Sequence, residues 1–282
     1  IYGAVLLDDD RIAINTNLAG CIIINKKGEF VQKISKHERI KNNNVLCMLY
    51  DRDKNVWLGL DNGIDLVLYS NSIQQIFPEG EDRNAGYTSM LYKNKLYLGL
   101  VSGAYEVPVT NEGDISYSRG IFKPVKGSKG QVWAFSNVND KLFMGHLRGA
   151  FTIENDSASV FDLGTGFWGF QSVNMSNSPY SLIAGTYNGS NFYNYSDGKI
   201  TNPKWEVHCD SAMVGVQHQN TIWASHPFKG LYKIQYNNGV PVVSMYKDVH
   251  KILSSNHNKL FSIRNKMILL SDKGIFEYDD KL

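Results

Sequence analysis

One glycine returns along this chain at a nearly constant interval, and each time it stands in the same setting. The setting is an apolar run, a short polar turn, the glycine and a second apolar run, as in VWLGLDNGIDLVL at residues 56–68. Successive copies are 43, 40, 46, 40, 41 and 44 residues apart. The seven glycines are Gly20, Gly63, Gly103, Gly149, Gly189, Gly230 and Gly274.

A repeat of about 40–45 residues made of short strands is typical of a β-propeller. One repeat cannot bury its own apolar faces, whereas stacked sheets can, and a closed ring removes exposed sheet edges. No segment shows sustained helical periodicity. We therefore predict an all-β fold, a single seven-bladed β-propeller domain over residues 1–282 made of four-stranded antiparallel blades. The predicted blades cover residues 1–36, 37–79, 80–124, 125–165, 166–203, 204–247 and 248–282.

The second repeat shows the strands most clearly. We place its four strands at residues 45–50, 56–60, 64–69 and 72–77. The repeated glycine follows the turn between the second and third strands, where a positive φ is needed. Small residues inside the second strand, such as Gly59 and Gly145, are expected where a side chain would collide with a neighbouring sheet. The last repeat ends after its third strand, so we predict an incomplete last blade. Either the N-terminal segment or a strand outside this sequence would complete it.

Composition narrows the function classes. The net charge of +2 comes from 29 basic and 27 acidic residues with no basic run, so nothing favours nucleic-acid binding. No run of 18 apolar residues occurs, so no membrane span is predicted. Cys21, Cys47 and Cys209 cannot all pair with one another and are expected to be small buried hydrophobes. Residue 1 is not Met, and we expect a fragment or a processed form.

Three stretches carry more than a general propeller pattern. NNNVLCMLYDRDKNVWLGLDNGI, at residues 42–64, resembles the two-component regulator propeller repeat. The segments GQVWAFSNVNDKLFMGHLRGAFTIEN and TIWASHPFKGLYKI resemble the sensor regions of Bacteroidetes transcriptional regulators. In that family, propeller repeats precede a triple-tyrosine domain, a membrane span and an intracellular output module. The output is a hybrid histidine kinase or a LuxR-type DNA-binding domain, and the resemblance favours the LuxR-type branch.

The resemblance implies a function for this chain. It implies an extracytoplasmic, periplasmic ligand-sensing domain of a protein anchored in the inner membrane. Its implied partners are a small polar ligand, such as an oligosaccharide, and the triple-tyrosine and output domains, which this sequence does not include. A homodimer is compatible with this plan, and the domain itself would contact no nucleic acid.

No catalytic or cofactor motif emerges from the sequence. G-x-S-x-G, H-E-x-x-H and C-x-x-C patterns and phosphate-binding glycine loops are missing. His208 and Cys209 are adjacent in a predicted strand, so their side chains would point to opposite faces and could not readily share a metal. We therefore expect neither a metal site nor a cofactor, and we expect no enzyme activity.

Propeller geometry selects the candidate binding residues. The turns between second and third strands emerge on the same face as the starts of the first strands, around the mouth of the central channel. Aromatic rings beside basic and amide groups suit a sugar, because its CH faces stack and its hydroxyls form hydrogen bonds. The ligand-binding residues predicted on this basis are His146, Arg148, Tyr187, His226, Lys229, Trp133 and Trp168.

Two alternative functions stay open at this point. A propeller glycosidase or polysaccharide lyase would need convergent carboxylates, or a Tyr or His base with an Arg. Asp61, Asp210 and Asp272 are the only loosely placed acids, and no spacing joins them. A non-catalytic scaffold that binds protein is the third interpretation.

Overall fold

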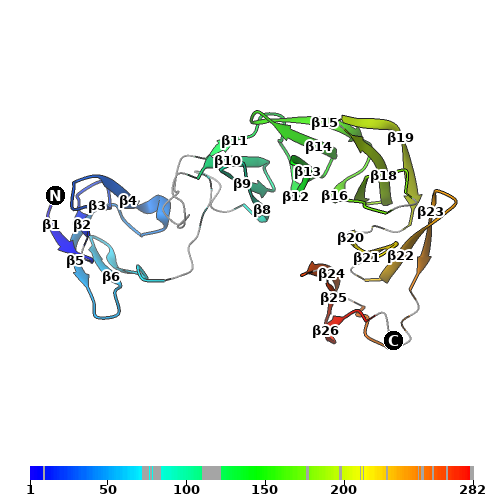
Figure 1. The fold of residues 1–282 in the computed structure, drawn as a ribbon. Helices are drawn as coiled ribbons and strands as arrows, with labels where there is room; N and C mark the ends of the chain where they lie inside the picture. Colours follow the sequence, from blue (N-terminus) through cyan, green and yellow to red (C-terminus); the bar gives the residue numbers. More distant parts are fainter. Residues whose placement is uncertain are drawn as a thin grey trace. The chain divides into compact units, whose positions relative to one another are not determined.

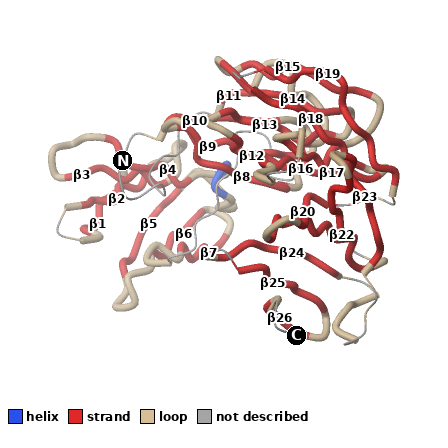
Figure 2. The backbone as a smooth tube through the Cα atoms, turned by 45° about the vertical axis from the view of Figure 1, so that its right-hand side comes forward, coloured by secondary structure: helices blue, strands red, loops and turns tan. Residues whose placement is uncertain are grey.

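Short antiparallel strands make up almost all the regular structure, together with one turn of 3-10 helix, η1 (Lys36–Glu38) (Figure 2). The computed structural model describes residues 1–8, 10–71, 76, 78, 84–109, 122–175, 178–196, 199–209, 211, 213–226, 228–246, 248, 251–255, 257–264 and 266–279. The chain forms two compact units. Unit 1 comprises Ile1–Asp82 and Val107–Phe122, and unit 2 comprises Arg83–Glu106 and Lys123–Leu282.

Unit 1 contains two antiparallel sheets that share one core. The first sheet has four strands and the second has three within the described residues. Their strands are β1 (Gly3–Leu6), β2 (Arg11–Asn15), β3 (Cys21–Asn25), β4 (Phe30–Ile34), β5 (Val45–Tyr50), β6 (Val56–Leu60) and β7 (Gly63–Val67). Alternation along the strands turns apolar side chains inward, and Ala13, Ile23, Val45 and Leu58 are completely buried.

A buried amide joins these two sheets of unit 1. Asn15 is almost fully buried at the end of β2. Its Nδ2 group donates to the carbonyl oxygens of Val45 and Leu46, each at 3.0 Å. The side chain thus supplies the hydrogen bonds that the start of β5 needs where it passes the neighbouring sheet.

Unit 2 contains the remaining sheets, which follow one another in chain order (Figure 1). The first strands of consecutive sheets lie side by side: β8 beside β12, β12 beside β16, β16 beside β20 and β20 beside β24. The strands are β8 (Gly86–Tyr92), β9 (Lys95–Leu100), β10 (Ala104–Pro108), β11 (Lys123–Pro124), β12 (Val132–Val138), β13 (Lys141–His146), β14 (Gly149–Glu154), β15 (Ser157–Leu163), β16 (Phe167–Ser172), β17 (Leu182–Thr186), β18 (Gly189–Ser196), β19 (Lys199–His208), β20 (Met213–His218), β21 (Thr221–His226), β22 (Gly230–Asn237), β23 (Val240–Met245), β24 (Asn258–Ile263), β25 (Lys266–Ser271) and β26 (Gly274–Glu277).

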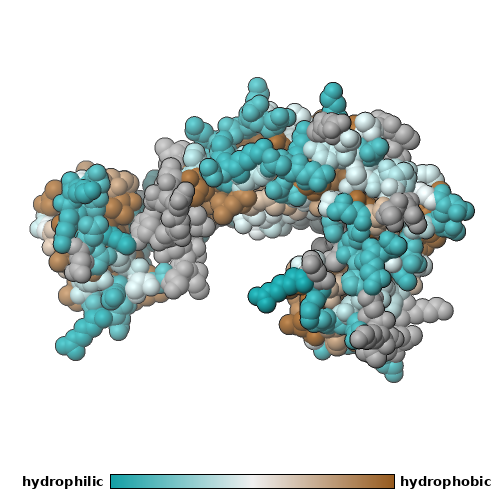
Figure 3. All heavy atoms as spheres, in the orientation of Figure 1, coloured by the Kyte–Doolittle hydropathy of each residue, from teal (hydrophilic) through white to brown (hydrophobic). Residues whose placement is uncertain are grey.

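Aromatic side chains fill the space between sheets of unit 2. Phe143 on β13 packs against Phe170 on β16, with ring centroids 5.2 Å apart, and against Tyr195 on β18, at 5.4 Å. Hydrophilic residues cover much of the outer surface near β14 and β15 (Figure 3). Glu154, at the end of β14, is exposed. The division into an apolar interior between sheets and a polar outer rim is what stacked blades require.

The predicted all-β propeller fold is confirmed. The described residues form seven antiparallel sheets in chain order, five with four strands and two with three. The last sheet, β24–β26, has three strands, as predicted for the incomplete repeat. β1 pairs with β2 in its own sheet, and how the last sheet is completed stays a prediction. In the second repeat, β5 and β6 have the predicted bounds, β7 begins at Gly63 and ends at Val67, and the predicted strand at 72–77 lies almost wholly outside the described residues.

One strand runs past a predicted blade boundary. β19 continues from Lys199 to His208, whereas the predicted blade ended at residue 203. A register shift opposite Phe192 and Asn194 absorbs extra residues and lets β19 pair with β18 as far as Gly189. The extent of the domain and the blade boundaries otherwise stay predictions.

The seven repeated glycines occupy equivalent positions. Each glycine either accepts a backbone hydrogen bond from the last residue before its turn or pairs with that residue in the β-ladder. In chain order these residues are Thr16, Leu60, Leu100, His146, Thr186, His226 and Ser271. Six of them have a positive φ, but Gly149 does not. At Gly149 the backbone of Asp162 on the adjacent strand occupies the place of a Cβ. Close approach, and not the left-handed conformation, therefore requires glycine there.

We predict that Gly63→Val destabilises the fold by about 1–3 kcal/mol. Gly63 has φ +139°, and no atom lies within 4 Å of the place its Cβ would take, so the cost is backbone strain. Denaturant unfolding measures the change. Asn62→Val is the control, because it adds the same side chain to the neighbouring exposed turn position without a positive φ. Equal stability of the two variants would contradict the turn assignment.

Candidate functional site

The first strands of several sheets share a one-residue irregularity. The ladder between first and second strands skips Leu46 in β5, Tyr87 in β8, Trp133 in β12 and Trp168 in β16. The residue after each skipped position pairs with a small residue of the second strand, namely Gly59, Gly99, Gly145 and Gly185. A bulge of this kind re-aims the side chain of the extra residue. In unit 2, three consecutive sheets therefore present an aromatic ring at the same structural position.

These three rings and Tyr187 form one connected group, which we call the aromatic arc (Tyr87, Trp133, Trp168 and Tyr187). The ring centroids of Tyr87 and Trp133 are 4.9 Å apart, and those of Trp133 and Trp168 are 4.8 Å apart. Tyr187, in the turn after β17, lies 4.8 Å from Trp168. Tyr87 is 43% exposed and the other three rings are half-buried. The arc is thus a shared surface of sheets β8–β11, β12–β15 and β16–β19.

Hydrogen bonds fix the orientation of the arc. The Nε1 group of Trp133 donates to the hydroxyl of Tyr187 at 2.6 Å, and that of Trp168 donates to the Ser211 hydroxyl at 2.8 Å. Gly166 leaves the space that the Tyr187 ring occupies. Burial raises the pKa of Tyr187 above its ordinary value, which is already well above physiological pH. The first bond joins two neighbouring sheets and the second joins β16 to the segment before β20, so both indole rings are held in place.

The two predicted site histidines lie beneath the turns. His146 is 1% exposed and His226 is 8% exposed. Nδ1 of His146 accepts the backbone N–H of Arg148 at 3.1 Å, and Nδ1 of His226 accepts those of Phe228 and Lys229, also at 3.1 Å. In three other turns the same position carries a hydroxyl residue, and its side-chain oxygen accepts a backbone N–H of the turn. These residues are Thr16, Thr186 and Ser271. Both histidines therefore cap turns instead of facing solvent.

The seven predicted residues fall into three groups. Trp133, Trp168 and Tyr187 come together in the arc, while Arg148 and Lys229 are exposed in their turns. The buried pair His146 and His226 holds the turns that present those two cations. Sequence reasoning missed Tyr87. The signal that could have identified it is an aromatic residue followed by a small one near the start of a first strand, shared by Tyr87–Thr88, Trp133–Ala134 and Trp168–Gly169.

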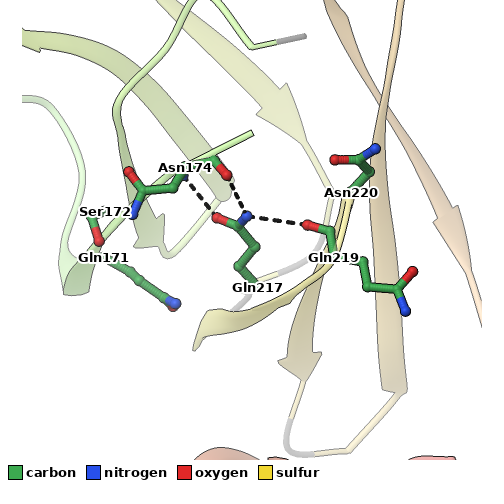
Figure 4. A pocket seen from close by; sticks show the side chains of 6 residues that line it. All are labelled: Gln171, Ser172, Asn174, Gln217, Gln219 and Asn220. Atoms are coloured by element: carbon green, nitrogen blue, oxygen red, sulfur yellow. Dashed lines mark hydrogen bonds between the residues drawn. The ribbon is translucent and has the colours of Figure 1, made fainter. Parts of the chain in front are cut away.

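A recess of unit 2 lies at the end of β16 that is remote from Trp168. It has a volume of about 490 Å³ and is lined by Gln171, Ser172, Asn174, Gln217, Gln219 and Asn220 (Figure 4). The side chain of Gln217 accepts the backbone N–H of Asn174 and donates to its carbonyl, both at 2.8 Å. Gln217 thereby ties β20 to the end of β16. No ring lines this recess, so it lacks the stacking surface that the arc has.

Other kinds of site find little support in the described part of the chain. No group of three or more His, Cys, Asp or Glu residues there is arranged to hold a metal ion. None of the described helices is long and apolar enough to cross a membrane. Cys21 is buried, Cys47 is exposed and Cys209 is intermediate, and none of the three forms a disulfide. The prediction of three buried cysteines is thus confirmed for Cys21 and wrong for Cys47, whose strand position lies on an exposed face.

The comparisons with known proteins agree with this architecture. Residues 39–62 match the family model for the two component regulator propeller. Two structures of the extracellular domain of BT4673 from B. thetaiotaomicron are similar, one described as part of a one component system and one as part of a hybrid two component system. They are 18% and 17% identical over 98% and 99% of this chain, with TM-scores of 0.53 and 0.54. No curated protein matches the chain.

These similarities concern the repeat and the fold. The resemblance to the two-component regulator propeller is confirmed by the matched repeat, and the solved structures confirm the propeller fold. The chain covers 38% of the length of each of the two BT4673 domains. The chain therefore corresponds to only part of each of these longer domains.

We predict a pH-dependent contribution of His146 to stability. Burial lowers its pKa below the ordinary 6.5, and the nearby Arg148 charge lowers it further. The unfolded chain then binds a proton at a higher pH than the folded one. The contribution of His146 to the free energy of unfolding is therefore complete above about pH 6.5, and it is lost as the pH falls through the lower pKa of the folded state. His146→Thr, which keeps an acceptor as at Thr186, should flatten the unfolding free energy between pH 7 and 5.

The control is His37→Thr, which removes one exposed histidine from the other unit. Unfolding free energies of both variants and the wild type are measured across the same pH series. If the His146→Thr and wild-type curves run parallel, His146 does not have the lowered pKa inferred from its burial.

Proposed function

We propose that this chain is an extracytoplasmic ligand-sensing propeller domain of a transmembrane transcriptional regulator or sensor. The observation that carries the proposal is the match of residues 39–62 to the two component regulator propeller, within a chain whose fold resembles the extracellular domain of BT4673. The ligand we propose is a glycan fragment or a similar polar small molecule. The full protein would reside in the inner membrane with this domain in the periplasm.

The geometry of the arc supports binding of a polar ring-shaped ligand. Its ring faces offer stacking area for sugar CH groups. Arg148 lies in the β13–β14 turn and Lys229 in the β21–β22 turn, both exposed, and each carries a charged hydrogen-bond donor. Rings that are already fixed by hydrogen bonds lose little conformational freedom on binding. A rigid surface of this kind suits recognition.

Signalling in this proposal needs no catalysis. A ligand that binds two states of the receptor unequally shifts the balance between them. The arc is made of side chains from three sheets, so a ligand that touches all of them favours one arrangement of those sheets. The downstream triple-tyrosine and output domains would read the change, either within one chain or in a homodimer.

Two rival functions receive less support. An enzyme would need converging acids, but Asp61 accepts a hydrogen bond from Asn44 in unit 1 and Asp272 lies in the β25–β26 turn of unit 2. Asp210 lies outside the described residues. A scaffold that binds protein would not need a connected group of rings such as the arc.

We predict that the purified domain turns over no glycan. Its products would be followed by chromatography after long incubation with polysaccharides and oligosaccharides. Turnover that is lost when one acid, such as Asp272, is changed to Asn would overturn the sensor proposal in favour of the enzyme.

We predict that Arg148→Ala weakens ligand binding by about 1–3 kcal/mol, because its planar group can hold two hydroxyls or a carboxylate. A thermal-shift screen with oligosaccharides identifies the ligand, and calorimetry measures the affinity. Stability should stay nearly constant, since the side chain is exposed. Arg52→Ala, at an exposed turn of unit 1, is the matched control. Wild-type affinity in Arg148→Ala would remove this turn from the site.

A further inference from the structure

We infer that the recess between the ends of β16 and β20 binds the main chain of a short, uncharged oligopeptide. The recess lies at the end of β16 that is remote from Trp168, and its lining differs in chemistry from the aromatic arc. This inference goes beyond the sensing function proposed for the arc and does not rest on it.

The lining of the recess is polar and neutral throughout. It consists of Gln171, Ser172, Asn174, Gln217, Gln219 and Asn220. A side-chain amide has one carbonyl acceptor and two N–H donors, so this lining can both accept and donate hydrogen bonds. The six side chains include no charge to pair with an ion and no ring to stack on a sugar. They favour a neutral ligand that carries donors and acceptors side by side, as a peptide main chain does.

One amide of the lining already binds a main chain. The side chain of Gln217 accepts the backbone N–H of Asn174 and donates to the carbonyl of the same residue, both at 2.8 Å (Figure 4). In an antiparallel ladder, a hydrogen-bonded neighbour makes the same pair of bonds. The Nε2 group of Gln217 also donates to the carbonyl of Gln219 at 3.1 Å. These bonds hold Gln217 in place and are the kind of pairing that we assign to the ligand.

Two further amides are available for a ligand. Gln171 is half-buried near the end of β16, and Asn220 is exposed in the turn after β20. Their side chains form no hydrogen bond within the part of the chain that the structure describes. Figure 4 shows them on either side of Gln217. Each can therefore pair with a peptide group of a ligand in the way that Gln217 pairs with Asn174.

The size and neutrality of the recess select an internal stretch of peptide. Its volume of about 490 Å³ lies within the range of small-ligand pockets, about 300–1,000 Å³. A charged terminus placed among neutral side chains would lose hydration without gaining an opposite charge. The ligand that fits is therefore a free oligopeptide that places an uncharged stretch of main chain, and not a charged end, in the recess.

The test is a titration of the wild-type domain, followed through the side-chain NH2 signals in proton–nitrogen NMR spectra. The probes are N-acetyl-trialanine amide, its analogue with each alanine N-methylated, zwitterionic trialanine and a neutral trisaccharide. N-methylation keeps the length and the neutrality of the probe but removes its main-chain N–H donors. The capped peptide should bind at least about threefold more tightly than the N-methylated peptide or the zwitterion.

Variants locate the binding in the recess. Gln171→Met and Asn220→Leu keep the approximate shape of each side chain and remove its amide. Each should weaken binding of the capped peptide about three- to tenfold. The signals that each variant loses also assign the two amides in the spectra. Gln32→Met, at a half-buried position of β4, and Asn62→Leu, at an exposed turn, are the matched controls and should bind as the wild type does.

Several results would overturn the inference. They are equal affinity for the N-methylated and unmethylated peptides, binding that survives both recess substitutions, and tighter binding of the trisaccharide at the recess amides. A domain that is folded by circular dichroism, yet shows no saturable shift with the capped peptide, overturns it as well. Oligosaccharide binding at the arc should be unchanged in Gln171→Met, so failure of the peptide site and failure of the sensing proposal are measured separately.

Discussion

The close approach of one sheet to the first strand of the next is the constraint on which the rest of unit 2 depends. A Cβ at Gly145 would lie 2.6 Å from the carbonyl oxygen of Phe167, and one at Gly99 would lie 2.8 Å from Cγ1 of Val132. Both contacts fall at the bulges of the next sheet, beside Trp168 and Trp133. Small residues in the second strands therefore allow the bulges to fit, and the bulges aim the rings that form the arc. The packing between sheets and the position of the arc thus both depend on the small residue that recurs in the second strands.

The turns at the glycines use different side chains for one task. In five of the seven turns, the side chain of the last residue before the turn accepts a backbone N–H of the turn, through a hydroxyl oxygen or an imidazole nitrogen. Thr186 and His146 are equivalent in this sense. A histidine in such a turn is therefore a structural residue, although its position near aromatic and basic groups makes it look like part of a binding site.

Much of the fold could be predicted from the sequence because the glycine interval and the second-repeat strands report local geometry. β5 and β6 have the bounds that the pattern indicates. The site could be predicted only in part. Trp133, Trp168 and Tyr187, which the sequence analysis selected, lie close together, and their role in binding stays a prediction. The burial of His146 could not be predicted, and Tyr87 was missed because the aromatic–small pattern at the start of a first strand is short and its meaning depends on the register shift. The strand β19 ran past its predicted boundary for the same reason.

The most direct test of the central claim, that ligand is held on the arc, is hydrogen–deuterium exchange of the domain with and without a bound oligosaccharide. The account predicts slower exchange in β8, β12, β16 and the turn at residues 187–189, since a ligand there would hold three sheets together. It predicts little change at the amide-lined recess around Gln217. Protection confined to that recess, or to the sheets of unit 1, would contradict the account.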